Sequence, residues 1–357
     1  MGKDFEIETE NVETDEAFEQ LFEDGKPFVV TDFEHETDGS ESWKPEPTPV
    51  VEPETTQDLT LETPLQVDMP LVHSEHLLDS DVPALAEEDE IVGSGWNKRV
   101  VVITGAASGI GLATARKFSL YADVVYNLSR ERQDDDNINW IKVDVTRSSD
   151  VRTAFEKIFE KEGQIDVLIN CAGIGFSGSV EGADTEDIAH VFNVNIVGTA
   201  TCCSAVIPYM RATGRGRIIN IASMAGAFPL PFQSFYSASK AAVINFTNAL
   251  RTEVAPLGIK TSCVLFSEIK TPFTENRIKN REDNRAYKYR LAKSVAKYEF
   301  AEQLGQEPEW VAARLFKLSN AKNPKSTVIF GLKNKWRLFL KRFLCDSTIN
   351  RMISRKY

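Results

Sequence analysis

Short runs of β-branched and aliphatic residues alternate with helical patterns through most of the chain. Each run is bounded by polar or glycine-containing segments and is apolar on both faces, which is typical of strands buried in a parallel sheet. Six runs occupy residues 99–104, 123–128, 140–143, 166–170, 217–221 and 260–265, with a candidate seventh at 327–330. Helical patterns lie at 112–118, 151–161, 188–210 and 238–254. The alternation predicts an α/β fold, a doubly wound parallel sheet of about seven strands with helices on both faces.

The N-terminal quarter of the chain lacks this pattern. Residues 1–90 hold 28 acidic side chains against three lysines, a net charge of −25, whereas the rest of the chain carries +13. So little apolar surface cannot offset the entropy lost on ordering the chain. We therefore expect a largely disordered acidic tail over residues 1–95, in which residues 15–33 can form a short docking segment. The tail either masks the basic domain or only keeps the protein soluble.

The C-terminal end forms a separate basic segment. Residues 331–357 hold eight basic residues and one acidic residue. A single amphipathic helix is predicted over 332–357. One stripe of this helix carries its apolar residues, Trp336, Phe339, Leu340, Phe343 and Leu344. Basic amphipathic helices lie on anionic membranes, or pack on a neighbouring subunit or on their own domain, and the sequence leaves these options open.

A glycine-rich loop joins the first predicted strand to the first predicted helix. Residues 104–111 read Thr-Gly-Ala-Ala-Ser-Gly-Ile-Gly. Glycines allow a tight turn and let the backbone approach a pyrophosphate, whose charge the N-terminus of a helix favours. Taken alone, the loop can also be an ordinary turn between a strand and a helix.

A second motif lies downstream, where Tyr236 and Lys240 are four residues apart and Ser223 precedes the tyrosine by thirteen residues. Side chains at positions i and i+4 share one face of a helix. An ammonium beside a phenol favours the phenolate and lowers the phenol's pKa from about 10, which equips it for proton transfer with a substrate oxygen. Alone, the pair is ordinary helix surface. Its place after a phosphate-binding loop points to catalysis.

As an ordered set, these motifs resemble the short-chain dehydrogenase/reductase family, in the branch with the TGxxxGxG and YxxxK motifs. The set also contains Asp144-Val145, Asn170-Cys-Ala-Gly173 and Asn193-Val-Asn195. The resemblance implies a Rossmann-type, dinucleotide-binding catalytic domain. We place this domain at residues 96–331, with a substrate lid at about 271–305.

Two positions depart from the family pattern. Cys171 stands where the family has the second asparagine of Asn-Asn-Ala-Gly. Phe266-Ser267 replaces the Pro-Gly that follows the sixth strand. The family glycine lets the backbone close against the nicotinamide side of the cofactor, so this loop is expected to sit differently and to bind less tightly.

The resemblance implies catalytic roles for four residues. Tyr236 is the general acid in reduction and the base in oxidation, while Lys240 lowers its pKa and binds the cofactor ribose. Ser223 donates a hydrogen bond to the substrate carbonyl oxygen and stabilises the charge that grows there. Asn195 holds a water that links Lys240 to solvent. Asn193 is the competing residue, but the Asn-x-x-Gly context favours Asn195.

The resemblance also implies a set of cofactor-binding residues: Gly105, Ser108, Gly109, Ile110, Gly111, Ser129, Arg130, Asp144, Val145, Asn170, Ala172, Gly173, Tyr236, Lys240, Ile269 and Thr271. In the family, an acidic residue that ends the second strand selects NAD(H). Here Ser129 takes that place, followed by Arg130, whose guanidinium suits a ribose 2′-phosphate. We expect NADP(H) to be preferred over NAD(H), with reduction as the direction in a cell, although Arg130 can also simply begin a solvated loop.

Apolar residues lie where the family lines its substrate cleft, at 228–232, Ile174 and Phe176. They either form a cleft for a hydrophobic carbonyl compound, such as a sterol-like ketone or a keto lipid, or pack the lid. The expected function is therefore NADP(H)-dependent interconversion of a carbonyl and an alcohol on a hydrophobic small molecule. The alternatives are a cofactor-binding regulator without turnover and a membrane-docked scaffold.

Other classes of function find little support. The five cysteines lack paired metal spacing and His190 is the only histidine after the tail, so no metal site is expected. The positive charge follows no nucleic-acid-binding motif. Without a secretory signal or a long uninterrupted apolar run, we expect a protein with reduced thiols in the cytoplasm, either free or peripheral at a membrane. The resemblance further implies a homo-oligomer, assembled through the helices that carry Ser204 and Tyr236.

Overall fold

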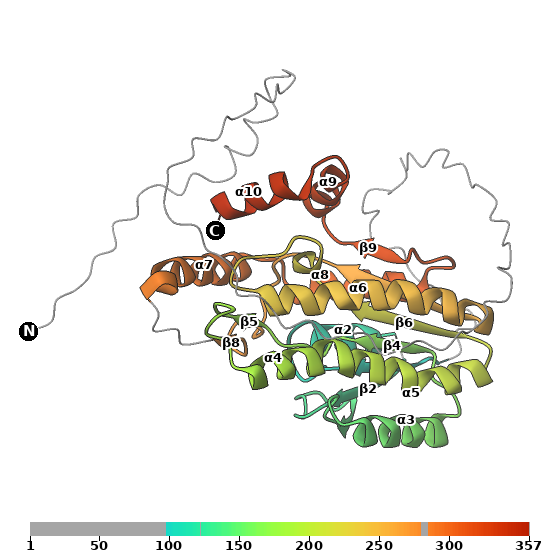
Figure 1. Ribbon diagram of the computed structural model, residues 1–357. Coiled ribbons are helices and arrows are strands. Elements are labelled where there is room, and N and C mark those ends of the chain that lie inside the picture. Colours follow the sequence, from blue (N-terminus) through green and yellow to red (C-terminus); the bar gives the residue numbers. More distant parts are fainter. Residues whose placement is uncertain (1–97, 122, 280–284, 357) are drawn as a thin grey trace, which may run out of the picture. The chain divides into compact units, whose positions relative to one another are not determined.

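The computed structural model of the protein describes residues 98–121, 123–279 and 285–356 (Figure 1). The predictions for the acidic tail, residues 1–95, lie outside these residues. The described part is built around one large sheet, whose arrangement decides where the functional side chains meet.

Seven parallel strands form this sheet, in the order β3-β2-β1-β4-β6-β7-β9. Their bounds are β1 Val100–Thr104, β2 Val124–Ser129, β3 Asn139–Lys142, β4 Val167–Asn170, β6 Gly216–Ile221, β7 Ile259–Leu265 and β9 Thr327–Ile329. The strand order reverses between β1 and β4, and in such sheets the ligand crevice lies at the carboxyl ends of the strands at this point. The predicted Rossmann-type α/β fold is confirmed, including the seventh strand.

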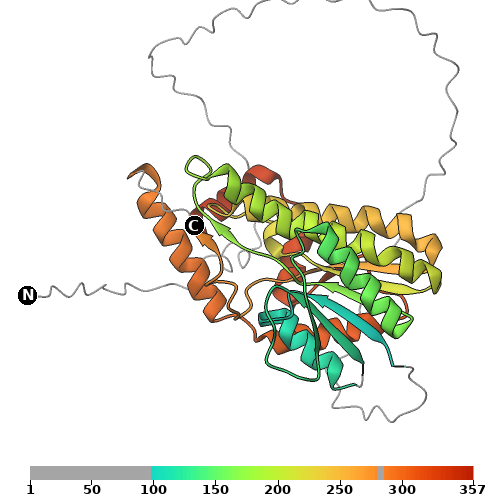
Figure 2. The same cartoon turned by 90° about the horizontal axis from the view of Figure 1, so that it is seen from below.

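Helices cover both faces of the sheet (Figures 1 and 2). One face carries α3 (Ser148–Glu162), α5 (Thr199–Ala212) and α6 (Ser234–Val254), and the other carries α2 (Gly109–Ser119) and α8 (Pro308–Asn320). Successive residues of a strand point to opposite faces, so Val100 and Val102 of β1 pack with the first layer. Val101 and Ile103 pack with the second layer. The continuous apolar runs in the sequence follow from this burial on both sides.

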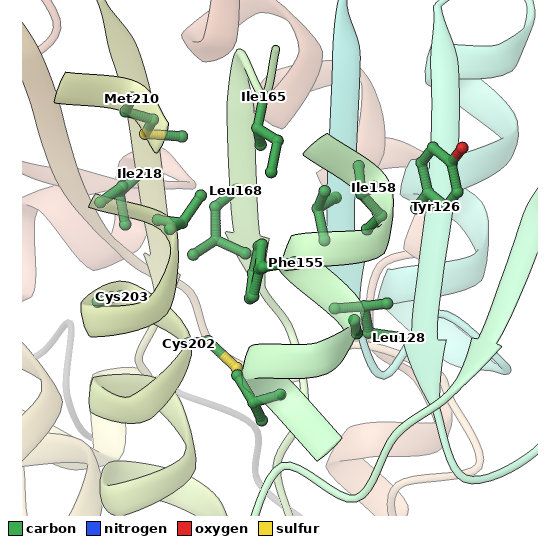
Figure 3. Close-up of a cluster of buried hydrophobic side chains, with 14 of the residues drawn as sticks. Tyr126, Leu128, Phe155, Ile158, Ile165, Leu168, Cys202, Cys203, Met210 and Ile218 are labelled. Atoms are coloured by element: carbon green, nitrogen blue, oxygen red, sulfur yellow. The ribbon is translucent and has the colours of Figure 1, made fainter. Parts of the chain in front are cut away.

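The larger core cluster lies between the sheet and the layer of α3 and α5 (Figure 3). Phe155 of α3, Leu168 of β4 and Met210 of α5 are completely buried in it. Cys202 and Cys203 also belong to this cluster, and both are free thiols that pack as small apolar groups. Each large side chain buried in this way contributes about 1.5–3 kcal/mol to folding.

The helix predicted at 188–210 is interrupted. α4 (Thr185–Phe192) continues into α5 through a π-helical segment, Asn193–Gly198. Among the described residues, Thr185–Ala212 is the one stretch long and apolar enough to cross a membrane, with a mean hydropathy of 1.4. Its residues Cys202, Val206 and Met210 lie in the core, so we interpret it as a core helix of the domain.

Three features of the structure were not predicted. β5 (Phe176–Ser177) and β8 (Ile278–Lys279) form a separate parallel pair, and α7 (Arg285–Gln303) fills the predicted lid region. The single helix expected over 332–357 is instead two helices, α9 (Leu332–Lys341) and α10 (Asp346–Lys356). The break has a local cause, because the Cys345 carbonyl accepts the first N–H bonds of a new helix, from Thr348 and Ile349.

Candidate active site

The glycine-rich loop leaves β1 and enters α2 at the ligand edge of the sheet. A Cβ on Gly111 would lie 2.4 Å from the Gly105 carbonyl oxygen, and a Cβ on Gly105 would lie 2.8 Å from Cα of Ala172. Only glycine fits such close backbone approaches. Ser108, the N-cap residue of α2, makes no side-chain capping bond. The first turn of α2 therefore has no side-chain cap and follows a closely packed glycine turn, an arrangement that suits the binding of a dinucleotide pyrophosphate.

Other predicted cofactor residues surround this loop. The Ala172 N–H donates to Thr104 Oγ1 at 3.1 Å, which joins the segment after β4 to the loop. Thr271 lies over Gly109, since a Cβ there would be 3.3 Å from the threonine Cβ. Ile269 is buried, while the half-buried Ile110 packs against the core. Sequence reasoning did not identify Asn127 of β2. Its Oδ1 accepts the Ala106 N–H at 3.1 Å and so attaches the glycine-rich loop to β2.

At the end of β2, the two residues expected to select the cofactor are placed differently. The Ser129 hydroxyl donates to the Glu131 carbonyl oxygen at 2.6 Å, so it serves the local turn. Arg130 is exposed and borders a hollow of about 780 Å³ at the ends of β2 and β3. Four bases and three acids line this hollow: Arg130, Lys142, Arg147, Lys157, Glu131, Asp144 and Asp150.

Asp144 lies in this hollow as predicted. Its Oδ1 accepts two hydrogen bonds from Thr146, at 3.0 Å from the N–H and 2.7 Å from the hydroxyl. Burial raises the pKa of the carboxyl, but these bonds and the charges of Arg130 and Arg147 outweigh it, and the net pKa is lowered. Val145, its neighbour, is buried against Gly198 of the π-helical segment. Asp144 is thus held ionised, as a hydrogen-bond acceptor.

Ser223 and Tyr236 meet at the carboxyl ends of β6 and β7. Ser223 caps a short 3₁₀ turn, Met224–Gly226, where its Oγ accepts the Ala225 N–H at 3.1 Å. Tyr236 is in the first turn of α6, and its side chain is hydrogen-bonded to that of Ser223. The structure therefore joins a serine and a tyrosine separated by thirteen residues into one polar pair.

The pKa of Tyr236 differs from the expectation that Lys240 lowers it. Burial raises the pKa of the phenol to about 12, while the Ser223 hydrogen bond and the charge of Arg277 act in the opposite direction. Lys240 Nζ lies 5.9 Å from the centre of the tyrosine ring and donates to the Ile221 carbonyl oxygen at 3.0 Å. In this arrangement the phenol is held as a proton donor.

Asn195 is completely buried in the π-helical segment, and its side chain connects the loop after β4 to α6. Its Nδ2 donates to the Ile174 carbonyl at 2.9 Å and to Ser239 Oγ at 3.0 Å, and its Oδ1 accepts the Ile174 N–H at 2.8 Å. Both amide donors are thus used by protein groups. A Cβ on Gly173 would lie 3.2 Å from Asn195 Oδ1 and 3.3 Å from Lys240 Nζ. Asn195 therefore positions the loop at Lys240. The predicted water relay stays a prediction.

Asn170 has a structural role where a cofactor contact was predicted. Its Nδ2 donates to Asn220 Oδ1 at 2.9 Å and contacts Cys203 Sγ at 3.4 Å, and Asn220 in turn donates to Thr247 Oγ1 at 3.0 Å. These groups form a buried polar chain between β4, β6 and α6. The Asn170 side chain thus braces the sheet behind the crevice.

The substrate side of the site is apolar, although not through every residue expected there. The Phe273 ring lies 5.7 Å from the Tyr236 ring. Phe228 and Ile174 are half-buried, as residues that line a cleft would be. Phe176 is completely buried against Phe235, so the expectation that it faces the cleft is wrong.

The lid and the C-terminal segment both contact the loop between Ser223 and Tyr236. From α7, the Tyr298 hydroxyl donates to the Pro231 carbonyl at 2.7 Å. From α9, Lys341 donates to the Ala227 carbonyl and lies 5.2 Å from the ring centre of Phe228. Phe232 has a positive φ of 60°, a conformation that is costly for a bulky residue. These contacts on both sides hold the loop in place over the site.

Phe266 and Ser267, which replace the family Pro-Gly, contact α9 and the segment just before it. Phe266 is buried against Phe330, and its carbonyl accepts the Met224 N–H at 3.1 Å, next to Ser223. Ser267 Oγ donates to Oδ1 of the buried Asn334 in α9. The loop after β7 is thus the anchor of the C-terminal segment, which sequence reasoning did not foresee.

The predicted apolar stripe of the C-terminal segment faces outward in part. Leu332, Trp336 and Phe343 are 71%, 58% and 73% exposed, and Phe339 is 48% exposed. The Trp336, Phe339 and Phe343 rings contact one another edge to face, with centroids 5.9 and 5.2 Å apart. We call these four residues the α9 stripe. Leu340 and Leu344 of the predicted stripe are half-buried.

Comparisons with known proteins agree with this geometry. The sequence profile of the short chain dehydrogenase family matches residues 99–282. A 3-ketodihydrosphingosine reductase from Bacteroides thetaiotaomicron is 39% identical over 229 residues, which are 63% of this chain and 85% of that protein.

Two solved structures are similar throughout the sheet and its helices. A short-chain dehydrogenase from Streptomyces avermitilis has a TM-score of 0.63 at 27% identity, covering 73% of this chain and 99% of that one. A structure of ElxO with NADP bound has a TM-score of 0.54 at 29% identity, covering 65% of this chain and 96% of that one.

Proposed function

The chain belongs to the short-chain dehydrogenase/reductase family and is an NAD(P)-dependent oxidoreductase acting on carbonyl and alcohol groups, and we propose that it reduces a hydrophobic ketone with NADPH. The hydrogen-bonded pair of Ser223 and Tyr236, beside the apolar ring of Phe273, carries the proposal. Ser223 donates to the substrate carbonyl oxygen, and Tyr236, protonated at neutral pH, transfers its proton to the oxygen as negative charge develops there. The nicotinamide, when bound, supplies the hydride.

The test is NADPH oxidation, followed by absorbance, against a panel of long-chain and cyclic ketones. The wild-type protein should oxidise NADPH with at least one of them, and Tyr236→Phe should lower kcat by roughly 100-fold or more, since a positioned general acid contributes that much. Tyr209→Phe is the matched control, because it removes a phenol hydroxyl of α5 whose ring packs on Phe159 of α3. Full turnover by the Tyr236→Phe variant would remove the assigned proton donor.

The apolar substrate side favours a long alkyl chain or a sterol-like ring system over a small polar ketone. The Phe273 ring lies next to Tyr236, and the half-buried Ile174 and Phe228 belong to the neighbouring loops after β4 and after Ser223. The similarity to a 3-ketodihydrosphingosine reductase supports the keto-lipid option within this class. Under this proposal, kcat/KM rises with chain length across a series of 2-alkanones. A series with no such trend would argue against it.

The preference for NADP(H) is part of the proposal. Arg130, Lys142 and Arg147 line the hollow at the end of β2, where a ribose 2′-phosphate would meet them. We expect Arg130→Ala to weaken NADPH binding by roughly 10-fold, the effect of one lost charge-assisted hydrogen bond, with NADH binding unchanged. Arg152→Ala, which removes an exposed arginine of α3 that does not line the hollow, serves as the control. Equal affinity of the wild-type protein for both cofactors would overturn this preference.

We also propose that the α9 stripe rests on an anionic membrane surface. Its exposed rings are flanked by Lys333, Lys335 and Arg337, and aromatic rings next to bases suit the boundary between acyl chains and anionic headgroups. In flotation assays, the wild-type protein should float with vesicles containing phosphatidylglycerol and much less with neutral ones. Replacing Trp336 and Phe339 by Ser should abolish flotation.

The control for the flotation assay is Leu120→Ser, which removes an even more exposed apolar side chain at the end of α2. Flotation that persists without the two aromatic residues would place the contact elsewhere. We further propose a homo-oligomer in the cytoplasm, where Cys202, Cys203 and Cys263 stay reduced; these three are buried free thiols. A monomer by light scattering would overturn the oligomer.

A further inference from the structure

A buried arginine in the lid has an unused hydrogen-bond donor. The side chain of Arg277 is 1% exposed, and its Nη2 donates to Glu302 of α7. Thr274 Oγ1 donates to the second carboxylate oxygen of Glu302, so both oxygens of this acid are used. Arg277 Nη1, in contrast, has no hydrogen-bond acceptor among the described residues.

This arginine lies close to the catalytic tyrosine. A Cβ on Gly175 would be 3.1 Å from Arg277 Nε and 3.0 Å from the Phe273 ring, so both side chains lie against the loop that follows β4. The Ile278 N–H donates to the Gly175 carbonyl at 3.0 Å and fixes the backbone beside it. The Phe273 ring centre is 5.9 Å from the guanidinium carbon and 5.7 Å from the Tyr236 ring centre. The guanidinium and the phenol therefore contact the same aromatic ring.

A second unused polar atom lies on the same side of the small sheet. Ser177 of β5 is 1% exposed, and its Oγ has no hydrogen-bond partner among the described residues. Alternate residues of a strand share a face, so Ser177 points to the side of Gly175 on which Arg277 lies. Phe176 packs on Phe235 instead. Most buried polar groups in native proteins have partners, so two unpartnered atoms on one side of this strand pair need an explanation.

We propose that Arg277 Nη1, with Ser177 Oγ on the same side of the β5–β8 pair, binds a neutral oxygen substituent that the substrate carries near its reacting carbonyl. This inference rests on the proposed ketone reductase function and narrows its substrate class to oxygen-substituted long-chain ketones. A guanidinium suits this task, because its planar fork can hold Glu302 with one nitrogen and a ligand with the other. The substrate oxygen satisfies an N–H that the folded protein otherwise leaves unpaired.

The charge balance decides between a neutral oxygen and an anion. Glu302 already neutralises Arg277, and Glu299 of α7 forms an ion pair with Lys279 of β8. A carboxylate or phosphate on the substrate would gain little net charge attraction here and would meet the Glu302 carboxylate. A hydroxyl or carbonyl oxygen accepts the same hydrogen bond without that repulsion. The subsite therefore fits a hydroxyl, ketone or ester oxygen.

The test compares two ketones of equal chain length, 1-hydroxy-3-undecanone and 4-dodecanone, in which a methyl group replaces the hydroxyl. With NADPH, wild-type kcat/KM should favour the hydroxyketone by roughly 10- to 100-fold, the usual range for a hydrogen bond to a charged group. Arg277→Met should remove this preference by lowering kcat/KM for the hydroxyketone alone. A purely structural role for Arg277 would lower both values together, because both ketones use the same lid.

Lys279→Met is the matched control, since it breaks the neighbouring ion pair between β8 and α7 and leaves Arg277 in place. This variant should keep the preference. If Arg277→Met does not fold, Arg277→Lys keeps a charge for Glu302 but lacks the fork, and it should lose most of the preference. A retained preference in the Arg277 variants, or an equal loss on both ketones, overturns the inference. Equal wild-type kcat/KM values on the two ketones would overturn the oxygen subsite but leave the proposed ketone reductase function standing. The absence of turnover with any ketone would overturn the proposed function itself.

Discussion

Replacing Lys240 by methionine should abolish catalysis and at the same time stabilise the folded protein at neutral pH. The side chain is 5% exposed, and its Nζ donates to the Ile221 carbonyl at 3.0 Å. Burial lowers the pKa of the amine from 10.5 to about 8, although the nearby Cys263 and Cys171 raise it. The fold therefore disfavours the charged form that the catalytic site uses.

The sign of the effect on stability follows from where the proton is bound. The unfolded chain keeps the lysine proton up to about pH 10.5 and the folded protein only up to about pH 8. Between these values the unfolded state binds more protons, so the free energy of unfolding rises with pH through this window. At pH 7 the fold bears the whole cost of the charged amine, on the order of 3 kcal/mol for a shift of this size.

Methionine removes this cost but also the hydrogen bond to Ile221, which is worth about 1 kcal/mol. The net expectation is a variant more stable by about 2 kcal/mol at pH 7, with the advantage lost by about pH 10. Urea denaturation of both proteins without cofactor, at these two pH values, measures the difference. Lys317→Met, on the exposed side of α8, is the control and should show no such pH dependence. The reasoning would be refuted if the Lys240→Met variant were less stable than the wild-type protein at pH 7. It would also be refuted if the difference in free energy of unfolding between the two proteins were the same at both pH values.

Three further changes test other parts of the structure. Phe155→Ala should lower the free energy of unfolding by about 3–5 kcal/mol in the same assay, because the site is completely buried between α3 and the sheet. Gly111→Ala places a methyl group 2.4 Å from the Gly105 carbonyl and should abolish NADPH binding measured by fluorescence. Asn334→Ala removes the partner of Ser267 and should raise the KM for NADPH, while Asn320→Ala, an exposed control on α8, should not.

Much of the domain could be predicted because its signals are local. Buried parallel strands must be apolar on both faces, so β1 and β4 appear as continuous runs in the sequence. The glycine loop is equally legible, since Gly105 and Gly111 meet backbone atoms that any Cβ would displace. The pair Tyr236 and Lys240 is set by helix geometry alone. The strands, the glycine loop and the spacing of Tyr236 and Lys240 are each determined by residues close together in the sequence.

The parts that sequence reasoning missed depend on contacts between distant segments. Arg277 and Glu302 lie in the predicted lid, where the sequence pattern did not single them out, yet Arg277 is buried by packing against Gly175, more than a hundred positions earlier. The pKa of Tyr236 was expected to follow its lysine, but burial by the surrounding chain dominates it. The cofactor role of Asn170 stays a prediction, and sequence reasoning missed its hydrogen bond to Asn220, which comes from another strand.

Two oddities of the sequence, the loss of Pro-Gly after β7 and the basic helix at the C-terminus, have one cause. Ser267 is hydrogen-bonded to Asn334, and Phe266 is stacked on Phe330 just before α9 begins. A proline at 266 would lack the aromatic ring that packs on Phe330. A glycine at 267 would lack the hydroxyl that donates to Asn334 of α9. The same loop accepts a hydrogen bond from Met224, the neighbour of Ser223, and Lys341 holds Ala227 from the other side. Helix α9 is thus attached at both of its ends to the loops next to Ser223, through Asn334 and through Lys341.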